Sequence, residues 1–369
     1  MGWSLHHKTG LIHSSPQQSY RGYTLVATNR GGHHANLIDM EGRICHRWYS
    51  EEGICYPYLL PNGNLLLRTN PPQVEGGERF GGSSASILEL DWDGNVVWSF
   101  RDSMLHHDFQ RLPNGNTLVL LWVPIPDESK DRVVGGYASD GDSLPMLGDL
   151  VQEITPDGSV VYEWKSWEHL NEEEDVICFL ERRRERTHQN ALNLTPDGNL
   201  LVSFRQTSTV GIVDKDSGDF TWKWGPGEVN HQHHPTYLDN GRILMFDNGC
   251  HRRGASRSRI LEVDPATNEI AWEYQGTPDI SFYSYNISSA ERQPNGNTLI
   301  CEGAPGRIFE VTPDKVIVWE YINPYFGDGG QAGSSNGVFR AHRYGPDHPG
   351  LQGKELDPAR YNNVNQLYA

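Results

Sequence analysis

Two kinds of β-hairpin alternate along nearly the whole chain, and this alternation constrains the fold more than any other feature. The first kind is an apolar strand, a turn ending in Asn-Gly or Asp-Gly, and a second strand. It occurs five times, as YLLPNGNLLLR (58–68), QRLPNGNTLVL (110–120), LNLTPDGNLLVSF (192–204), TYLDNGRILMF (236–246) and ERQPNGNTLIC (291–301). Such dipeptides between apolar runs are strong signals for tight hairpin turns.

The second kind of hairpin ends in a strand that carries a tryptophan. These tryptophans recur at intervals of 47 to 66 residues, at Trp48, Trp98, Trp164, Trp224, Trp272 and Trp319. A repeat of about this length is typical of propeller blades. Because tryptophan has a large apolar body and one polar N–H group, we expect each to pack between neighbouring blades.

A pair of hairpins makes one four-stranded antiparallel sheet, so the chain predicts an all-β fold with a single six-bladed β-propeller domain. Residues 22–50 supply three strands and residues 335–344 supply one. We therefore expect the two chain ends to complete a shared sixth blade, leaving residues 1–21 and 352–369 as terminal extensions. The other five blades are expected at about 54–101, 106–166, 188–225, 232–275 and 286–323.

Charge and apolar patterning exclude several kinds of partner. The 369 residues carry a formal net charge of -17, whereas a protein that binds nucleic acid needs a basic face. No apolar run approaches the length of a membrane span. The five cysteines are scattered without a CxxC motif, and the first ten residues lack an export-signal pattern. We expect reduced thiols, a cytoplasmic protein and a small-molecule substrate, with a homodimer as a possible assembly.

Polar residues share one register of the strands that we expect to be innermost. His107, Asn190, His233 and Ser288 each precede the turn glycine of their hairpin by eight residues. The long insertions fall at the same end of the blades, where ordered loops commonly carry function. The polar residues near this register, which we expect to face a common opening, are Cys55, Tyr56, His106, Asp108, His188, His231, His234, Ser289, Arg340 and His342.

Several motifs at these positions resemble the arylsulfotransferase-like family of β-propellers, which does not use a nucleotide sulfate donor. They are HHDFQRLPNGN (106–116), THQN (187–190) with LLVSFRQ (200–206), QHHPTYLDNGRILMFDNG (232–249) and VFRAHRYGPDHPGL (338–351). The resemblance covers nearly the whole chain from Tyr23. It implies an enzyme in which a histidine takes a sulfuryl group from an aryl sulfate and passes it to an acceptor phenol, with no cofactor required.

The resemblance also implies roles for individual residues. By position in the motifs, His233 is the nucleophile, His188, Asn190 and Arg205 surround the sulfuryl group, and His107 is a further active-site histidine. A neutral imidazole is a competent nucleophile, and a fixed arginine stabilises charge that develops on the sulfuryl oxygens.

The choice between His233 and its neighbour His234 as nucleophile stays open, and His234 is otherwise expected to bind substrate. Tyr56 and Tyr285 are expected to stack on an aryl ring. The remaining candidates for substrate binding are Asp108, Ser288, Arg340 and His342.

Two other functions compete with this interpretation. His107, His188 and His233 come from three different blades and form a rival metal set, which would hold Zn²⁺ or a similar divalent ion in a lyase or hydrolase. The third possibility is a non-catalytic propeller that binds a ligand or a protein. One further local prediction concerns NEEEDVICFLERRRERT (171–187), which mixes charge with a short apolar core and predicts an amphipathic helix.

Overall fold

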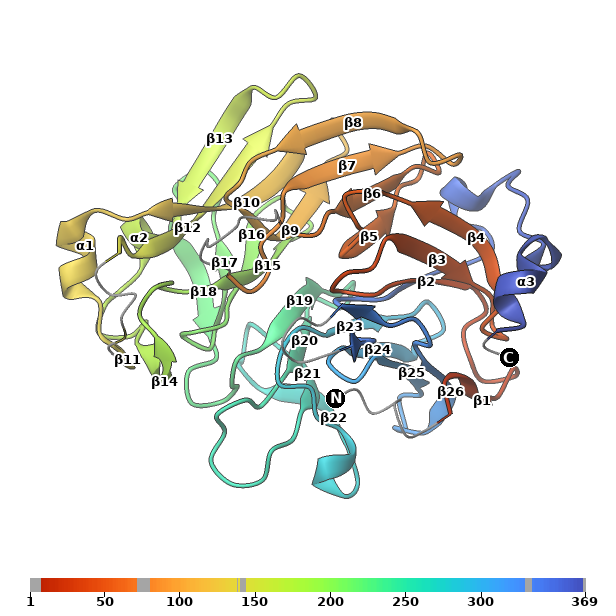
Figure 1. The fold of residues 1–369 in the computed structure, drawn as a ribbon. Helices are drawn as coiled ribbons and strands as arrows, with labels where there is room; N and C mark the ends of the chain where they lie inside the picture. Colours follow the sequence, from red (N-terminus) through yellow and green to blue (C-terminus); the bar gives the residue numbers. More distant parts are fainter. Residues whose placement is uncertain (1–7, 72–79, 138, 140–143, 329–333, 368–369) are drawn as a thin grey trace. The chain divides into compact units, whose positions relative to one another are not determined.

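The computed structural model describes residues 8–71, 80–137, 139, 144–328 and 334–367. These residues form six antiparallel four-stranded blades, the all-β propeller class that the hairpin repeats predict (Figure 1). The chain divides into two compact units with three blades each: unit 1 comprises residues 1–72, 85–101 and 284–369, and unit 2 comprises residues 73–84 and 102–283. Within the described ranges, no helix is long and apolar enough to cross a membrane.

Unit 1 contains the blade that both chain ends share. Its strand order is β29-β2-β3-β4, with β29 at His342–Tyr344, β2 at Tyr23–Ala27, β3 at His34–Ile38 and β4 at Ile44–Tyr49. β29 and β2 run antiparallel, with Tyr23 opposite Tyr344. The predicted closure of this blade by N- and C-terminal strands is therefore confirmed.

The other two blades of unit 1 have the orders β5-β6-β7-β8 and β23-β24-β25-β26, and β1 adds a fifth strand beside β26. Their bounds are β5 Tyr56–Leu59, β6 Leu65–Arg68, β7 Ser86–Leu90, β8 Val96–Arg101, β23 Ser289–Arg292, β24 Thr298–Glu302, β25 Arg307–Val311, β26 Ile317–Ile322 and β1 Gly10–Ser14. The short elements are β27 Gly327–Asp328, β28 Ser334–Ser335, η5 Pro349–Leu351, η6 Pro358–Tyr361 and α3 Asn362–Asn365.

Unit 2 contains blades of the orders β9-β10-β12-β13, β15-β16-β17-β18 and β19-β20-β21-β22. Their bounds are β9 Leu105–Arg111, β10 Thr117–Pro124, β12 Leu147–Ile154, β13 Val160–Lys165, β15 Gln189–Leu194, β16 Leu200–Phe204, β17 Thr209–Val213, β18 Phe220–Trp224, β19 His233–Tyr237, β20 Ile243–Asp247, β21 Arg259–Val263 and β22 Ile270–Gln275. The short helices are α1 Asp127–Arg132, α2 Ser166–His169 and η3 Asp279–Ser281.

The N-G-N turns are fastened to the third strand of their own blade. Nδ2 of Asn64 donates to Oε1 of Glu89 at 2.7 Å, and Nδ2 of Asn116 donates to Oε1 of Glu153 at 2.6 Å. Gly115 between the asparagines has a φ of 89°, in the left-handed region that favours glycine. The turn sequence thus recurs because its glycine adopts the left-handed conformation of the turn and its second asparagine binds a glutamate.

Tryptophans on the fourth strands bind the turns of neighbouring blades, as predicted. The Nε1–H donors and their backbone acceptors are Trp48 with Asp91 (3.1 Å) and Trp319 with Met40 (2.9 Å) in unit 1, and Trp164 with Gly218 (2.9 Å) in unit 2. In the blade that contains β18, Trp224 packs against Ile243 and Met245 of the next blade, as predicted, and the nearby Trp222 donates to Oδ1 of Asn268 at 2.8 Å.

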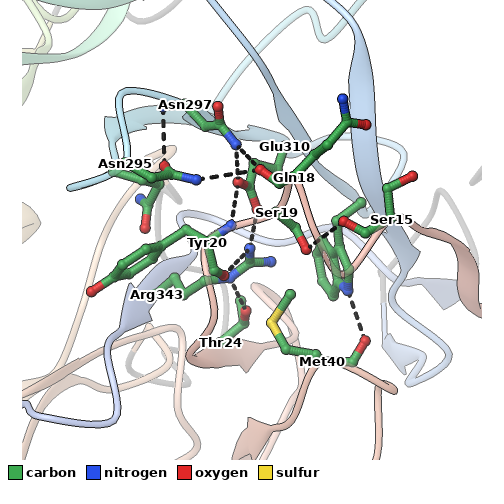
Figure 2. Close-up of polar contacts among 12 residues, drawn as sticks. Ser15, Gln18, Ser19, Tyr20, Thr24, Met40, Asn295, Asn297, Glu310 and Arg343 are labelled. Carbon is green, nitrogen blue, oxygen red and sulfur yellow. Dashed lines mark hydrogen bonds and ion pairs between the residues drawn. The ribbon is translucent and has the colours of Figure 1, made fainter.

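A buried ion pair ties the segment between β1 and β2 to the C-terminal strand (Figure 2). Arg343 on β29 pairs with Glu310 on β25, and neither side chain is exposed. Glu310 also accepts from the backbone N–H of Tyr20 at 2.7 Å and from Nδ2 of Asn297 at 2.6 Å, while Nε of Arg343 donates to Oγ1 of Thr24 at 3.0 Å. Both ends of the chain therefore meet at one buried carboxylate.

Residues 171–187 do not form the predicted amphipathic helix. Instead, β14 (Ile177–Arg182) pairs in parallel with β11 (Gly135–Tyr137). The ICFLER run contains β-branched and aromatic residues that suit a strand. Phe179 and Leu180 are exposed, so this run does not bury the apolar face that a surface helix would need.

Candidate active site

Left-handed backbone occurs at four histidines that lie within or just before the first strands of the blades of unit 2. φ is 48° at His107, 53° at His188, 58° at His231 and 52° at His234. Residues other than glycine seldom adopt this region, and such strain concentrates at functional sites. β9, β15 and β19 each carry a bulge near their first residues, and bulges re-aim side chains. The number of residues between a histidine and its turn glycine therefore does not show which histidines occupy equivalent positions in their blades.

His107 belongs to a buried group of side chains that includes a carboxylate. Nδ1 of His107 lies 3.0 Å from Nδ1 of His106, and Nε2 of His106 lies 3.5 Å from Oδ1 of Asp149. Trp122 stacks on the His106 ring at a centroid distance of 4.3 Å. The backbone N–H of His107 donates to the carbonyl of Gly82 at 2.8 Å. His107 thus makes hydrogen bonds through both its backbone N–H and its ring.

Asp149 is fully enclosed, and burial raises its pKa from 3.8 to about 6. Two donors oppose this effect of burial by stabilising the charged form. The Thr187 hydroxyl donates to Oδ2, and the backbone N–H of Gln189 donates to Oδ1 at 3.1 Å. The Asp149 carboxyl group therefore loses its proton in the pH range in which an ordinary histidine does.

His188 is paired with Glu185, three residues earlier in the chain. Nδ1 of His188 contacts Oε2 of Glu185, and because a carboxylate accepts, Nδ1 is the donor of this pair. The His188 ring makes an edge contact with the His107 ring at a centroid distance of 4.4 Å. The structure thus brings these two predicted catalytic histidines together.

The hydrogen bonds of His233 define which ring nitrogen carries its proton. Nδ1 lies 2.7 Å from Oδ1 of Asn248 and 3.1 Å from the backbone oxygen of His231. Both partners are acceptors, so Nδ1 carries the proton and Nε2 of the neutral ring carries the lone pair. Next to it, Nδ2 of Asn190 donates to the backbone oxygen of Gln232 at 2.8 Å.

Arg205 binds a carboxylate that the sequence did not single out. Its Nη1 lies 2.7 Å from Oε1 of Glu181 on β14. The pKa of the nearby His231 falls to about 2, first because the ring is buried and then because Arg205, His251, His233 and His188 add positive charge. These electrostatic contacts bring Arg205, His188 and His233 into one neighbourhood.

Asp108 and His234 are the substrate-binding candidates on β9 and β19. The Asp108 carboxylate accepts from the backbone N–H groups of Phe109 at 3.0 Å and Leu192 at 2.8 Å, so it joins β9 to β15. These contacts are structural, and substrate binding by Asp108 stays a prediction. His234 is buried beside His233 in β19.

Five of the substrate-binding candidates belong to unit 1. The Tyr56 hydroxyl lies 3.1 Å from Nε2 of His342, and the Arg340 guanidinium lies over the Tyr56 ring at 5.0 Å. Oγ of Ser288 donates to Oγ of Ser284 at 2.9 Å. Tyr285 is exposed. Tyr56, Arg340 and His342 thus form one cluster within unit 1.

A group of side chains that could hold a metal ion occurs in unit 2, and its members differ from the rival metal set. Among the described residues, the His, Cys and carboxylate groups whose ligand atoms converge on one point are Cys178, His231 and His251, within 4.8 Å of one another. None of the expected ligands His107, His188 and His233 belongs to this group.

Residues 57–324 match the family model described as Arylsulfotransferase (ASST). The chain belongs to this family. The resemblance read from the motifs is therefore confirmed, and membership supports a sulfotransferase-like activity in general. The matched range includes every predicted catalytic residue, whereas Tyr56, Arg340 and His342 lie outside it.

One solved structure with a TM-score above 0.5 resembles this arylsulfotransferase-family chain in fold, and two others have lower scores. A protein of unknown function from Bacteroides caccae has a TM-score of 0.56 and 14% identity, over 87% of this chain and 98% of that one. A catalytically inactive virginiamycin B lyase from Staphylococcus aureus, with quinupristin, has a TM-score of 0.46 and 13% identity, over 85% of this chain and 88% of that one. A streptogramin B lyase has a TM-score of 0.48 and 15% identity, over 91% of this chain and 93% of that one. No curated protein matches the sequence.

Four polar residues that contact the candidate site residues of this family member were not predicted from the sequence. They are Asp149, Glu181, Glu185 and Asn248. Asp149 and Glu181 reach their partners only through the fold. Glu185 and Asn248 had local signals, since Glu185 lies three residues before His188 and Asn248 belongs to the FDNG phrase.

Proposed function

We propose that this chain transfers a sulfuryl group from an aryl sulfate to a phenolic acceptor through a covalent intermediate on His233. The observation that carries the proposal is the hydrogen bond from Nδ1 of His233 to Asn248, which leaves the Nε2 lone pair for attack. Family membership supports the reaction class. In the first step, Nε2 attacks sulfur, an S–N bond forms, and the bond from sulfur to the aryl oxygen breaks.

His188 acts as the acid and then as the base in this proposal. In its protonated form it gives the Nε2 proton to the leaving phenolate, while the Glu185 carboxylate stabilises the charged ring. In the second step the neutral ring takes the proton from the acceptor phenol. The phenolate attacks sulfur, the S–N bond breaks, and His233 is restored.

Arg205 stabilises charge on the sulfuryl oxygens. Its guanidinium has five N–H donors, and Glu181 binds Nη1, so Arg205 is anchored at one end while other donors serve an anionic group. His107, linked to Asp149 through His106, supplies a further polar group beside His188.

Steady-state kinetics test this proposal. With 4-nitrophenyl sulfate as donor and phenol as acceptor, a covalent intermediate predicts parallel double-reciprocal lines when both concentrations are varied. His233→Ala should abolish transfer, whereas His13→Ala, which changes an exposed histidine on β1, should not. Intersecting lines together with an active His233→Ala variant would refute the proposal, and loss of activity only in His234→Ala would move the nucleophile to that residue.

A further inference from the structure

We propose that Cys178, His231 and His251 bind a zinc ion at a site that is distinct from the sulfuryl-transfer histidines. One ligand atom of each residue lies within 4.8 Å of the ligand atoms of the other two. Sγ of Cys178 lies 3.5 Å from Nδ1 of His251. A thiolate and two imidazoles are the ligand types that Zn²⁺ prefers, and small movements bring such atoms to bonding distance around one ion.

The three ligands come from three separate segments of unit 2. Cys178 is on β14, His231 precedes β19, and His251 follows β20. His231 and His251 have φ values of 58° and 63°, in the left-handed region that is strained for residues other than glycine. Two strained histidines whose rings meet at a centroid distance of 4.7 Å indicate a local geometry that serves a ligand.

The environment of the His231 ring is the second, independent observation. The residue is fully buried, and neither ring nitrogen has a hydrogen-bond partner among the residues that the structure describes. The nearest carboxylate oxygen, Oε1 of Glu181, lies 3.6 Å from Nδ1, which is beyond hydrogen-bonding distance. Buried polar atoms normally have a partner, and a metal ion at the centre of the cluster would supply one.

Glu181 makes the local charge compatible with a cation. Its Oε1 lies 2.7 Å from Nη1 of Arg205, 3.6 Å from Nδ1 of His231 and 3.8 Å from Nδ1 of His251. The carboxylate therefore stands between the guanidinium and the proposed ion. It serves as a fourth ligand or orients a water in that position, and binding of Zn²⁺ releases the Cys178 thiol proton to solvent.

Cobalt substitution tests the site without any turnover, so its outcome is independent of the proposed sulfuryl transfer. The full chain, purified without a metal-affinity tag and treated with chelator, is titrated with Co²⁺. A sulfur-to-cobalt charge-transfer band should appear, saturate near one equivalent and disappear when Zn²⁺ is added. Cys178→Ser should abolish the band, and His251→Ala, which changes a partly exposed ligand, should weaken binding at least about 10-fold.

Two matched variants serve as controls. Cys250→Ser changes the thiol next to His251, and His13→Ala changes an exposed histidine of unit 1. Both should keep the band and the affinity of the unaltered chain. A band that survives in Cys178→Ser, or no band at all together with less than stoichiometric zinc, would overturn the proposal.

Discussion

Nδ1 of His233 donates to Oδ1 of Asn248 at 2.7 Å, so the partner of the proposed nucleophile is fifteen residues further along the same hairpin. The hairpin β19–β20 brings the two side chains together, because His233 begins β19 and Asn248 follows the last residue of β20. The lone pair of the neutral ring is thereby assigned to Nε2. This contact gives the His233 ring one orientation before any substrate binds.

Asn248→Ala should lower kcat about 10- to 100-fold and leave KM nearly unchanged, because the ring loses the shorter of the two hydrogen bonds that fix its tautomer and orientation. Asn240→Ala is the matched control, since Asn240 binds Glu262 in the turn of the same blade. Steady-state kinetics and urea unfolding of both variants check this. Equal losses of kcat in the two variants, in parallel with stability, would assign Asn248 a purely structural role.

Glu185→Gln should slow transfer more for donors whose leaving phenol is more basic. The carboxylate supports the charged form of His188, and an acid matters most when the leaving group needs its proton. Compared with the unaltered chain, we expect a loss of about 100-fold with phenyl sulfate and a much smaller loss with 4-nitrophenyl sulfate. A loss that is the same for both donors would contradict the assignment of His188 as the acid.

Burial of Asp149 should appear in the pH dependence of stability. Since its pKa in the folded chain is about 6 instead of 3.8, the protonated carboxyl stabilises the fold at low pH. This contribution is complete below about pH 4 and is lost as the pH rises through about 6, an effect of about 3 kcal/mol. His106, His188 and Glu185 also face this region, so the difference in unfolding free energy between the unaltered chain and Asp149→Asn isolates the effect. A difference that does not change with pH would refute it.

Glu310→Gln should destabilise the fold by about 3 to 5 kcal/mol, because Arg343 would stay buried without its counter-charge. Glu355→Gln breaks the exposed pair with Arg360 and should cost less than about 1 kcal/mol. Urea unfolding measures both. Similar small losses would show that the buried pair contributes little to joining the two chain ends.

The blades could be predicted from the sequence because each rests on a local pattern. The N-G-N turns and the tryptophans specify hairpins within about twenty residues, and the structure has the expected sheets. β1 (Gly10–Ser14) lacks a turn signal and finds its partner β26 only in the folded chain. The segment 171–187 was predicted as a helix from its mixture of charge and apolar residues, but its short apolar run suits a strand.

The candidate site could be predicted only in part. Histidine motifs led to His107, His188 and His233, but their spacing in the sequence did not predict that the rings of His107 and His188 make contact. The partners of His106 and Arg205 are distant in sequence and come from other strands. Such contacts depend on the whole fold, and the chain alone gave no spacing rule for them.

The most direct test of the central claim is the intact mass of the protein after brief mixing with 4-nitrophenyl sulfate, recorded under native conditions at neutral pH. We predict the added mass of one sulfuryl group, lost when phenol is supplied as acceptor and absent in His233→Ala. Peptide mapping should place the group on His233. An adduct that persists in His233→Ala, or rapid transfer without any adduct on the chain, would contradict a histidine intermediate at this residue.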